Sequence, residues 1–233
     1  MIRLTNCATF CLLYLNRFKI YNPNCPNQIH LKLVTYHDYV IKDGKYIGKF
    51  DEMYSKFEDP WMQSNQPNQY SRTAGIIHVK NFGIKSLLEC GCGLGYYANW
   101  IYQETGITPV SVDISSVAIE KAKKLFPHLH FEMANIATDL PKYTNVDCVM
   151  WAEIVWYILP DLNKIIETLR NNFKNKYLIV NQVFYKGTQK YGVEYFSNLE
   201  QFIQYMPFEL LGKCEATRAS DSTIETSTIF KIG

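Results

Sequence analysis

Three alternating glycines behind an acidic residue are the part of the sequence best suited to bind a ligand. The apolar run 84–88 leads into Glu89, which is followed by Gly91, Gly93 and Gly95. Glycine adopts positive φ freely, so this spacing predicts a tight turn after a strand, with backbone N–H groups that can face a ligand. A carboxylate at position 89 suits a ligand with a cationic amine better than one with a pyrophosphate.

The spacing of these glycines differs from that of the proteins that bind dinucleotides. Their fingerprint is G-x-G-x-x-G, in which the last glycine lets a helix pack closely on a strand. Tyr96 stands where that glycine would be. An NAD-dependent oxidoreductase is therefore disfavoured. A plain tight turn and a binding module without catalysis both remain open as alternatives.

Two further carboxylates follow predicted strands. Asp113 ends the stretch 108–113, and Glu153 comes just after the stretch 146–151. Parallel sheets place their ligands at the carboxyl ends of their strands, so both side chains are expected near a site there. Asp113 can accept hydrogen bonds from both hydroxyls of a ribose, or it can cap the helix that begins near Ser115. Glu153 can act as a base or hold an amine, or it can cap a turn or pair with a lysine.

The elements that would position these residues alternate between strand and helix, which makes the chain an α/β protein. Helical patterns separate the apolar runs, and this alternation predicts a parallel sheet covered on its faces. A helix over 67–80 should precede the sheet, with Tyr70, Ala74, Ile77 and Lys80 on one face and Lys80 at its negative end. The predicted strands cover residues 84–88, 108–113, 130–133, 146–151 and 177–180, and two later stretches are 208–214 and 226–232.

The pattern E-x-G-x-G-x-G resembles the first motif of class I S-adenosylmethionine-dependent methyltransferases. Within that class, the segment Trp151–Leu159 resembles the S-E-V-L-Y-Y-L segment of nodulation-S-type methyltransferases, which N-methylate an amino sugar. Phe50–Tyr54 and Glu58–Trp61 resemble the N-terminal segment of the same family. The resemblance covers roughly residues 50–182, and it departs from the family pattern at Ala152 and Trp156.

The resemblance implies a Rossmann-like class I methyltransferase fold. Its sheet is mainly parallel and seven-stranded, with an antiparallel C-terminal strand pair and helices on both faces. Residues 1–49 would form an N-terminal arm with a small hairpin at Asp43-Gly44, and residues 50–233 the methyltransferase domain, with a lid over 50–66. The activity that the resemblance implies is methyl transfer to N or O of a small-molecule acceptor, a sugar or sugar-linked intermediate of bacterial surface-glycan biosynthesis.

The resemblance and the positions of single residues together suggest the site residues. Glu153 is the first candidate for base or amine anchor. His37 is the second, as a histidine of the N-terminal lid, with a plain surface histidine as its alternative. The acceptor would contact Trp156, Tyr157 and Tyr185, although packing in the core is an alternative for these aromatics. Tyr185 belongs to the aromatic stretch 183–196, which is expected to follow the fifth strand. S-adenosylmethionine would contact the loop, the next strand ends and the lid, through Glu89, Gly91, Cys92, Gly93, Gly95, Asp113, Ile114, Asn135, Ile136, Tyr54 and Trp61.

Composition narrows the choice of partners. The 233 residues carry a formal net charge of +2 without a Lys/Arg cluster, which disfavours a nucleic-acid partner. The seven cysteines include no C-x-x-C pair, which favours reduced thiols in the cytoplasm over a metal site. The apolar stretch 10–15 is too short to span a membrane. A monomer or homodimer acting on a small molecule is expected.

Overall fold

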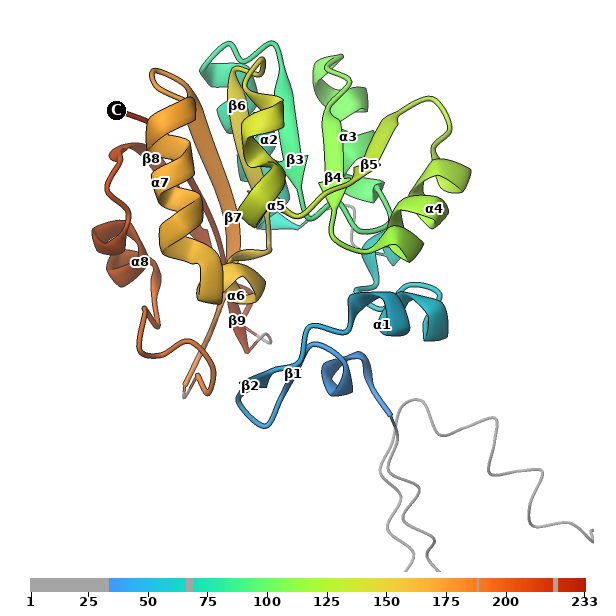
Figure 1. Ribbon diagram of the computed structural model, residues 1–233. Coiled ribbons are helices and arrows are strands. Elements are labelled where there is room, and N and C mark those ends of the chain that lie inside the picture. Colours follow the sequence, from blue (N-terminus) through green and yellow to red (C-terminus); the bar gives the residue numbers. More distant parts are fainter. Residues whose placement is uncertain (1–33, 66–68, 188, 220–221) are drawn as a thin grey trace, which may run out of the picture. The chain divides into compact units, whose positions relative to one another are not determined.

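A mixed sheet of seven strands organises the chain (Figure 1). The computed structural model describes residues 34–65, 69–187, 189–219 and 222–233. Positions 1–33 of the predicted arm, and the predicted start of the helix at 67, lie outside these residues. The strands are β3 (Leu87–Cys90), β4 (Val110–Asp113), β5 (His130–Met133), β6 (Cys148–Ala152), β7 (Tyr177–Tyr185), β8 (Glu209–Ala216) and β9 (Thr223–Lys231).

The order of the strands across the sheet is β5-β4-β3-β6-β7-β9-β8. The first five of these are parallel, and β9 runs antiparallel to both β7 and β8. The chain moves from β3 to β4 on one side and later returns to β6 on the other. A crevice opens at such a switch point, beyond the carboxyl ends of the strands. The predicted fold class is confirmed, including the antiparallel C-terminal pair.

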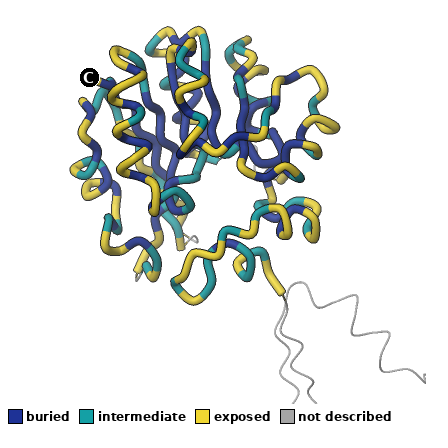
Figure 2. Tube along the Cα trace, in the orientation of Figure 1, coloured by how far each residue is buried: buried dark blue, intermediate teal, exposed yellow. Residues whose placement is uncertain are grey.

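Helices cover both faces of the sheet. On one face α2 (Tyr70–Asn81) and α3 (Tyr96–Thr105) pack on β3, β6 and β7 through a cluster that includes Ile76 and Ile101. On the other face α5 (Ile136–Asp139), α7 (Leu162–Asn172) and α8 (Leu199–Tyr205) bury Leu169 and Phe202 against the strands. Figure 2 shows that the buried residues concentrate along the strands. The remaining helices are α1 (Phe50–Lys56), α4 (Ser116–Leu125) and α6 (Val155–Ile158), with short 3-10 turns at Tyr36–Asp38, Gln63–Asn65, Leu140–Tyr143 and Leu159–Asp161.

The predicted hairpin is present before α1. β1 (Ile41–Lys42) and β2 (Lys45–Tyr46) pair across Asp43 and Gly44, whose φ values are 51° and 75°. Two successive positive φ angles are what a two-residue turn needs in order to match the twist of its strands.

Two predictions about individual elements are wrong. β7 continues to Tyr185 instead of ending at position 180, because β9 pairs with it along all nine residues. In α2 the predicted face is largely exposed: Tyr70 and Ile77 are 42% and 49% accessible. The buried face carries Ser71 and Arg72 beside small and apolar residues, and these polar side chains obscured the pattern. Lys80 pairs with Glu104 of α3 at 2.9 Å.

Among the described residues, no helix has the length and apolar character needed to cross a membrane. Cys90, Cys92, Cys148 and Cys214 are free thiols, and the other three cysteines lie outside the described part of the chain.

Candidate active site

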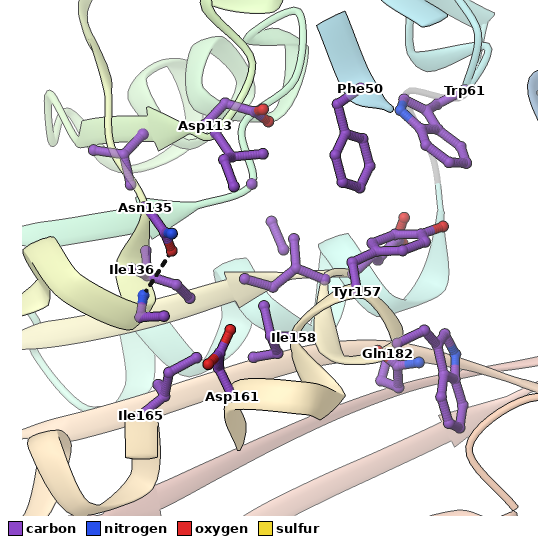
Figure 3. A pocket seen from close by; sticks show the side chains of 18 of the residues that line it. Phe50, Trp61, Asp113, Asn135, Ile136, Tyr157, Ile158, Asp161, Ile165 and Gln182 are labelled. Atoms are coloured by element: carbon purple, nitrogen blue, oxygen red, sulfur yellow. Dashed lines mark hydrogen bonds between the residues drawn. The ribbon is translucent and has the colours of Figure 1, made fainter. Parts of the chain in front are cut away.

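A cavity of about 320 Å³ lies at the carboxyl ends of the parallel strands. Its walls come from the strand ends, from α6 and from the N-terminal segment 36–63. This segment begins earlier than the lid predicted over 50–66, and we call it the lid from here on. Figure 3 shows Asp113 and Asn135 at one end of this cavity and Tyr157 and Gln182 at the other. The volume falls in the range of small-molecule sites.

The glycine loop 91–95 forms the predicted turn after β3, and neighbouring side chains pack closely against it. Its three glycines have φ values of 82°, 55° and 82°. A Cβ at Gly91 would lie 1.9 Å from Cγ2 of Ile154, and one at Gly95 would lie 2.5 Å from the ring of Phe131. Both the backbone conformation and the close neighbours therefore require glycine here. Gly91 lines the cavity.

Asp113 ties two turns together at the cavity wall. Its Oδ2 accepts the N–H of Gly93 and its Oδ1 accepts the N–H of Ser115, both at 2.9 Å. Ser115 itself caps α4, because its Oγ accepts the N–H of Ala118 at 3.1 Å. The carboxylate of Asp113 is thus an anchor of the glycine loop that still lines the cavity with its remaining lone pairs. Burial raises the pKa of Asp113 above its usual value.

Glu89 lies beneath the loop and does not line the cavity. It is fully buried, and its Oε2 accepts the Ser111 hydroxyl at 2.7 Å. Its Oε1 has no hydrogen-bond partner among the described residues. Burial raises the pKa of Glu89 to about 7, and the hydrogen bond from Ser111 opposes this shift.

Ile114, Asn135 and Ile136 line the same end of the cavity as Asp113. Asn135 caps α5, since its Oδ1 accepts the N–H of Ala137 at 3.0 Å (Figure 3). Ile114 is half exposed and Ile136 is buried. Two apolar side chains and one amide make this end suitable for a flat heterocycle.

The lid brings Tyr54 and Trp61 to the cavity wall. Trp61 Nε1 donates to the hydroxyl of Tyr54 at 2.9 Å. That hydroxyl would be only 2.8 Å from a Cβ at Gly93, so the lid rests directly on the glycine loop. Burial raises the pKa of Tyr54 well above its usual range.

Gln63 is a lid residue that the sequence did not single out. Its Oε1 accepts the N–H of Leu94 at 2.8 Å, and its Nε2 approaches the carbonyl of Cys92 at 3.5 Å. Cys92 itself is buried and does not line the cavity. Asp51 of α1 makes a second attachment, because its Oδ1 accepts the Ser115 hydroxyl at 2.6 Å. The lid is therefore fastened to the turns after both β3 and β4.

Glu153 lies on the cavity wall just past β6 in a strained conformation. Its φ is 63°, which costs free energy for a residue with a side chain. Its Oε1 accepts the Ser71 hydroxyl at 3.0 Å, and its Oε2 lies 3.4 Å from Nη2 of Arg72. Ser71 in turn donates its N–H to Oε2 of Glu225 in β9 at 3.1 Å. Glu153 therefore pairs with an arginine and keeps its place at the cavity.

Arg72 is the second functional candidate that the sequence analysis missed. It is 7% exposed, and it is the only Lys or Arg among the described residues that line the cavity. Its guanidinium lies 5.5 Å from the ring centroid of Tyr97, whose hydroxyl donates to the Arg72 carbonyl at 3.0 Å. A buried guanidinium at a cavity wall can hold a carboxylate. The sequence did contain a signal for this residue, because Arg72 stands among the small and apolar residues of the buried face of α2.

Aromatic side chains dominate the other end of the cavity. This end is lined by three residues that the sequence analysis predicted, Trp156, Tyr157 and Tyr185. It is also lined by two residues of the lid, Tyr36 and Tyr46. The Tyr157 ring meets those of Phe50 and Trp61 at centroid distances of 5.5 and 5.7 Å. Trp156 also packs in the core, since its ring meets that of Phe184 edge-on at 5.6 Å. Burial raises the pKa of Tyr157 well above its usual range.

His37 is not brought to the cavity. It is exposed, its ring centroid lies 4.1 Å from that of Tyr36, and it is not among the residues that line the cavity. Of the two residues predicted to be catalytic, the structure places only Glu153 on the wall.

The strand order, the glycine loop and the carboxylate at the end of β4 together are those of a class I S-adenosylmethionine-dependent methyltransferase. A family model described as a methyltransferase domain matches residues 84–212, which is more than half of the chain. The chain belongs to this family, and its cofactor is S-adenosylmethionine. The alternative of an NAD-dependent oxidoreductase falls away.

Solved structures with the same fold are distant in sequence. The N-methyltransferase NodS from Bradyrhizobium japonicum WM9, in complex with S-adenosyl-L-homocysteine, is 16% identical with a TM-score of 0.59, covering 79% of this chain and 97% of that one. A TehB-like SAM-dependent methyltransferase from Corynebacterium glutamicum is 15% identical with a TM-score of 0.57, covering 79% and 98%. The MccD protein is 15% identical with a TM-score of 0.58, covering 71% and 97%. No curated protein matches the sequence.

Proposed function

We propose that this methyltransferase acts on a nitrogen or oxygen atom of a small, sugar-linked acceptor, as in bacterial surface-glycan biosynthesis. The observation that carries the proposal is the aromatic end of the cavity, where Tyr36, Tyr46, Tyr157 and Tyr185 surround the space next to Glu153. Aromatic rings offer flat surfaces for the apolar C–H face of a sugar, and a carboxylate accepts hydrogen bonds from its hydroxyl or amino groups.

The opposite end suits the cofactor. Asp113 would accept hydrogen bonds from the ribose, and Asn135 with Ile114 and Ile136 would hold the adenine. Arg72 would hold the methionine carboxylate, since its guanidinium is buried at the wall beyond Gly91. Glu89 lies behind the glycine loop and does not line the cavity. Its unpartnered Oε1 could accept a hydrogen bond from the amino group of S-adenosylmethionine only if the loop moved aside.

The bound sulfonium supplies an activated methyl group. The residues of this chain would align the nucleophile, exclude water and take up a proton. Glu153 is the carboxylate positioned to accept a proton from a hydroxyl or ammonium, or to hold an ammonium until it loses one. The lid excludes water through Tyr54 and Trp61.

The substitution Glu153→Gln tests this assignment. It should leave S-adenosylhomocysteine binding near that of the parent in calorimetric titration. Turnover of an amino sugar or sugar acceptor should fall about 10²-fold or more, the range for a positioned acid–base group. Glu209→Gln, at an exposed position on β8, is the control. Turnover of Glu153→Gln close to that of the parent would remove Glu153 from the reaction.

A further inference from the structure

The cavity contains a buried amide whose oxygen has no partner. Gln182 of β7 is 1% exposed and lines the aromatic end of the cavity (Figure 3). Its backbone is fixed in the middle of the sheet, where it pairs with Thr226 of β9 and accepts the Thr226 hydroxyl at 2.9 Å. The position of the side chain is therefore set by the strand.

The orientation of the amide follows from its neighbours. The Nε2 of Gln182 donates to the carbonyl of Val183 at 3.1 Å, and Trp156 Nε1 donates to the same carbonyl at 2.9 Å. A carbonyl oxygen can only accept, so the nitrogen of the amide must face it. The Oε1 is thereby turned away from Val183 and has no hydrogen-bond partner among the described residues. Its surface is almost fully covered, so a ligand group reaches it only when a neighbouring side chain moves.

The preceding residue of β7 shows what a structural amide looks like in this sheet. Asn181 is fully buried and points to the opposite face from Gln182, as successive residues of a strand do. Its Oδ1 accepts the Ser227 hydroxyl at 2.8 Å and its Nδ2 donates to Tyr97 at 3.0 Å. Buried polar groups in proteins are normally satisfied in this way, and an unsatisfied one costs free energy.

We propose that Gln182 is a specificity-determining residue whose Oε1 accepts a hydrogen bond from an N–H or O–H group of the methyl acceptor. The inference rests on the proposed function. It requires that the methyl acceptor carry an N–H or O–H donor close to the atom that is methylated. Glu153, which lies at the same end of the cavity, is also an acceptor, and the tyrosine hydroxyls there can donate or accept. A site that offers two acceptors among aromatic rings selects a ligand rich in donors and rejects analogues that lack them.

The first test is thermal unfolding of the full chain without any acceptor. Gln182→Met removes the unpartnered oxygen together with the Nε2 donor to Val183, but the Val183 carbonyl keeps the hydrogen bond from Trp156. Its Tm should therefore stay within about 2 °C of the parent or rise. Asn181→Leu is the matched control on the same strand, and it should lower Tm by about 4 °C or more because two buried partners are orphaned. A fall for Gln182→Met as large as that for Asn181→Leu would make Gln182 a structural residue and overturn the inference.

The second test is methyl transfer from S-adenosylmethionine to matched acceptors. Each sugar keeps the amino or hydroxyl group that would be methylated, and the neighbouring position is supplied in amino, hydroxyl and deoxy form; simple alkyl and aryl amines are included. For the acceptor that the parent uses, Gln182→Met should raise KM about tenfold or more with kcat within about threefold, and it should not change KM for the deoxy form. Comparing the amino and hydroxyl forms shows whether Gln182 accepts its hydrogen bond from an N–H or from an O–H group.

An unchanged KM, or an equal increase for the deoxy form, would overturn the role of Gln182. Turnover of amines but of no sugar would instead refute the sugar-linked acceptor, while the KM comparison on the active amine would still decide Gln182. Should the parent use none of these acceptors, the Tm comparison decides the inference.

Discussion

The buried carboxyl of Glu89 makes the stability of the protein depend on pH in a way that a single substitution should remove. Glu89 is fully buried, and its pKa lies near 7 in the folded protein against an ordinary value of 4.5. Below pH 4.5 both the folded and the unfolded chain hold the proton. Between pH 4.5 and 7 only the folded chain holds it, so the free energy of unfolding falls as pH rises.

The size of the effect follows from the same values. The folded and unfolded pKa values differ by about 2.5 units, and each unit corresponds to 1.36 kcal/mol. Above pH 7 the ionised Glu89 therefore costs about 3 kcal/mol relative to a protonated one. Glu89→Gln keeps an oxygen for the Ser111 hydroxyl and cannot ionise. This variant should match the parent near pH 4.5 and exceed it by about 3 kcal/mol at pH 8.

Urea unfolding at a series of pH values measures this difference. Taking the difference between parent and variant cancels the contribution of carboxyls that do not interact with Glu89. The charge of Asp113 does interact with Glu89 and raises its pKa, so this interaction is part of the measured difference. Glu167→Gln, at an exposed position on α7, is the control and should show no such pH-dependent gain. A constant difference between Glu89→Gln and the parent from pH 4.5 to 8 would refute the reasoning, because it would mean that Glu89 does not change its protonation in this range.

The remaining predictions concern the turns that hold the cofactor. Asp113→Ala should weaken S-adenosylhomocysteine binding by about 2–4 kcal/mol in calorimetric titration, and it should also lower the free energy of unfolding by about 1–3 kcal/mol because Gly93 and Ser115 lose their acceptor; an unchanged dissociation constant would leave Asp113 a purely structural role. Gln63→Leu should make S-adenosylhomocysteine dissociate about tenfold faster in stopped-flow measurements, since the Leu94 N–H loses its lid partner. Equal dissociation rates for this variant and the parent would show that the attachment does not restrain the lid.

Much of the fold could be predicted from the sequence because the buried strands are short apolar runs between turn residues. The runs around Leu88, Val112 and Val149 are strands with no exposed residue to confuse the pattern. The glycine loop and Asp113 could also be placed, because the loop directly follows β3 and Asp113 is the last residue of β4. β7 was predicted too short because its outer half is stabilised by β9, which lies far along the chain.

The parts of the site that sequence reasoning missed depend on contacts between distant segments. Arg72 belongs to a helix face whose partners, Glu153 and Tyr97, come from two other elements. Gln63 makes its hydrogen bond with the N–H of Leu94 only because the folded lid lies on the glycine loop. The unpartnered oxygen of Gln182 is visible only once the carbonyl of Val183 is known to hold the amide nitrogen. Local patterns carry no trace of such contacts.

The contact between Ser71 and Glu225 has a consequence for the order in which the enzyme becomes competent during its synthesis. Ser71 holds Glu153 and is itself held by Glu225, so the proposed catalytic carboxylate is supported by a strand that comes after every other element of the fold. β6 ends at residue 152 and β9 at residue 231, a separation of 79 residues. At translation rates of about 5–20 residues per second, roughly 4–16 s pass between them. Through that interval the nascent chain has its glycine loop and Asp113 but lacks the support of its carboxylate, so it can acquire a binding site for the cofactor before it can use one.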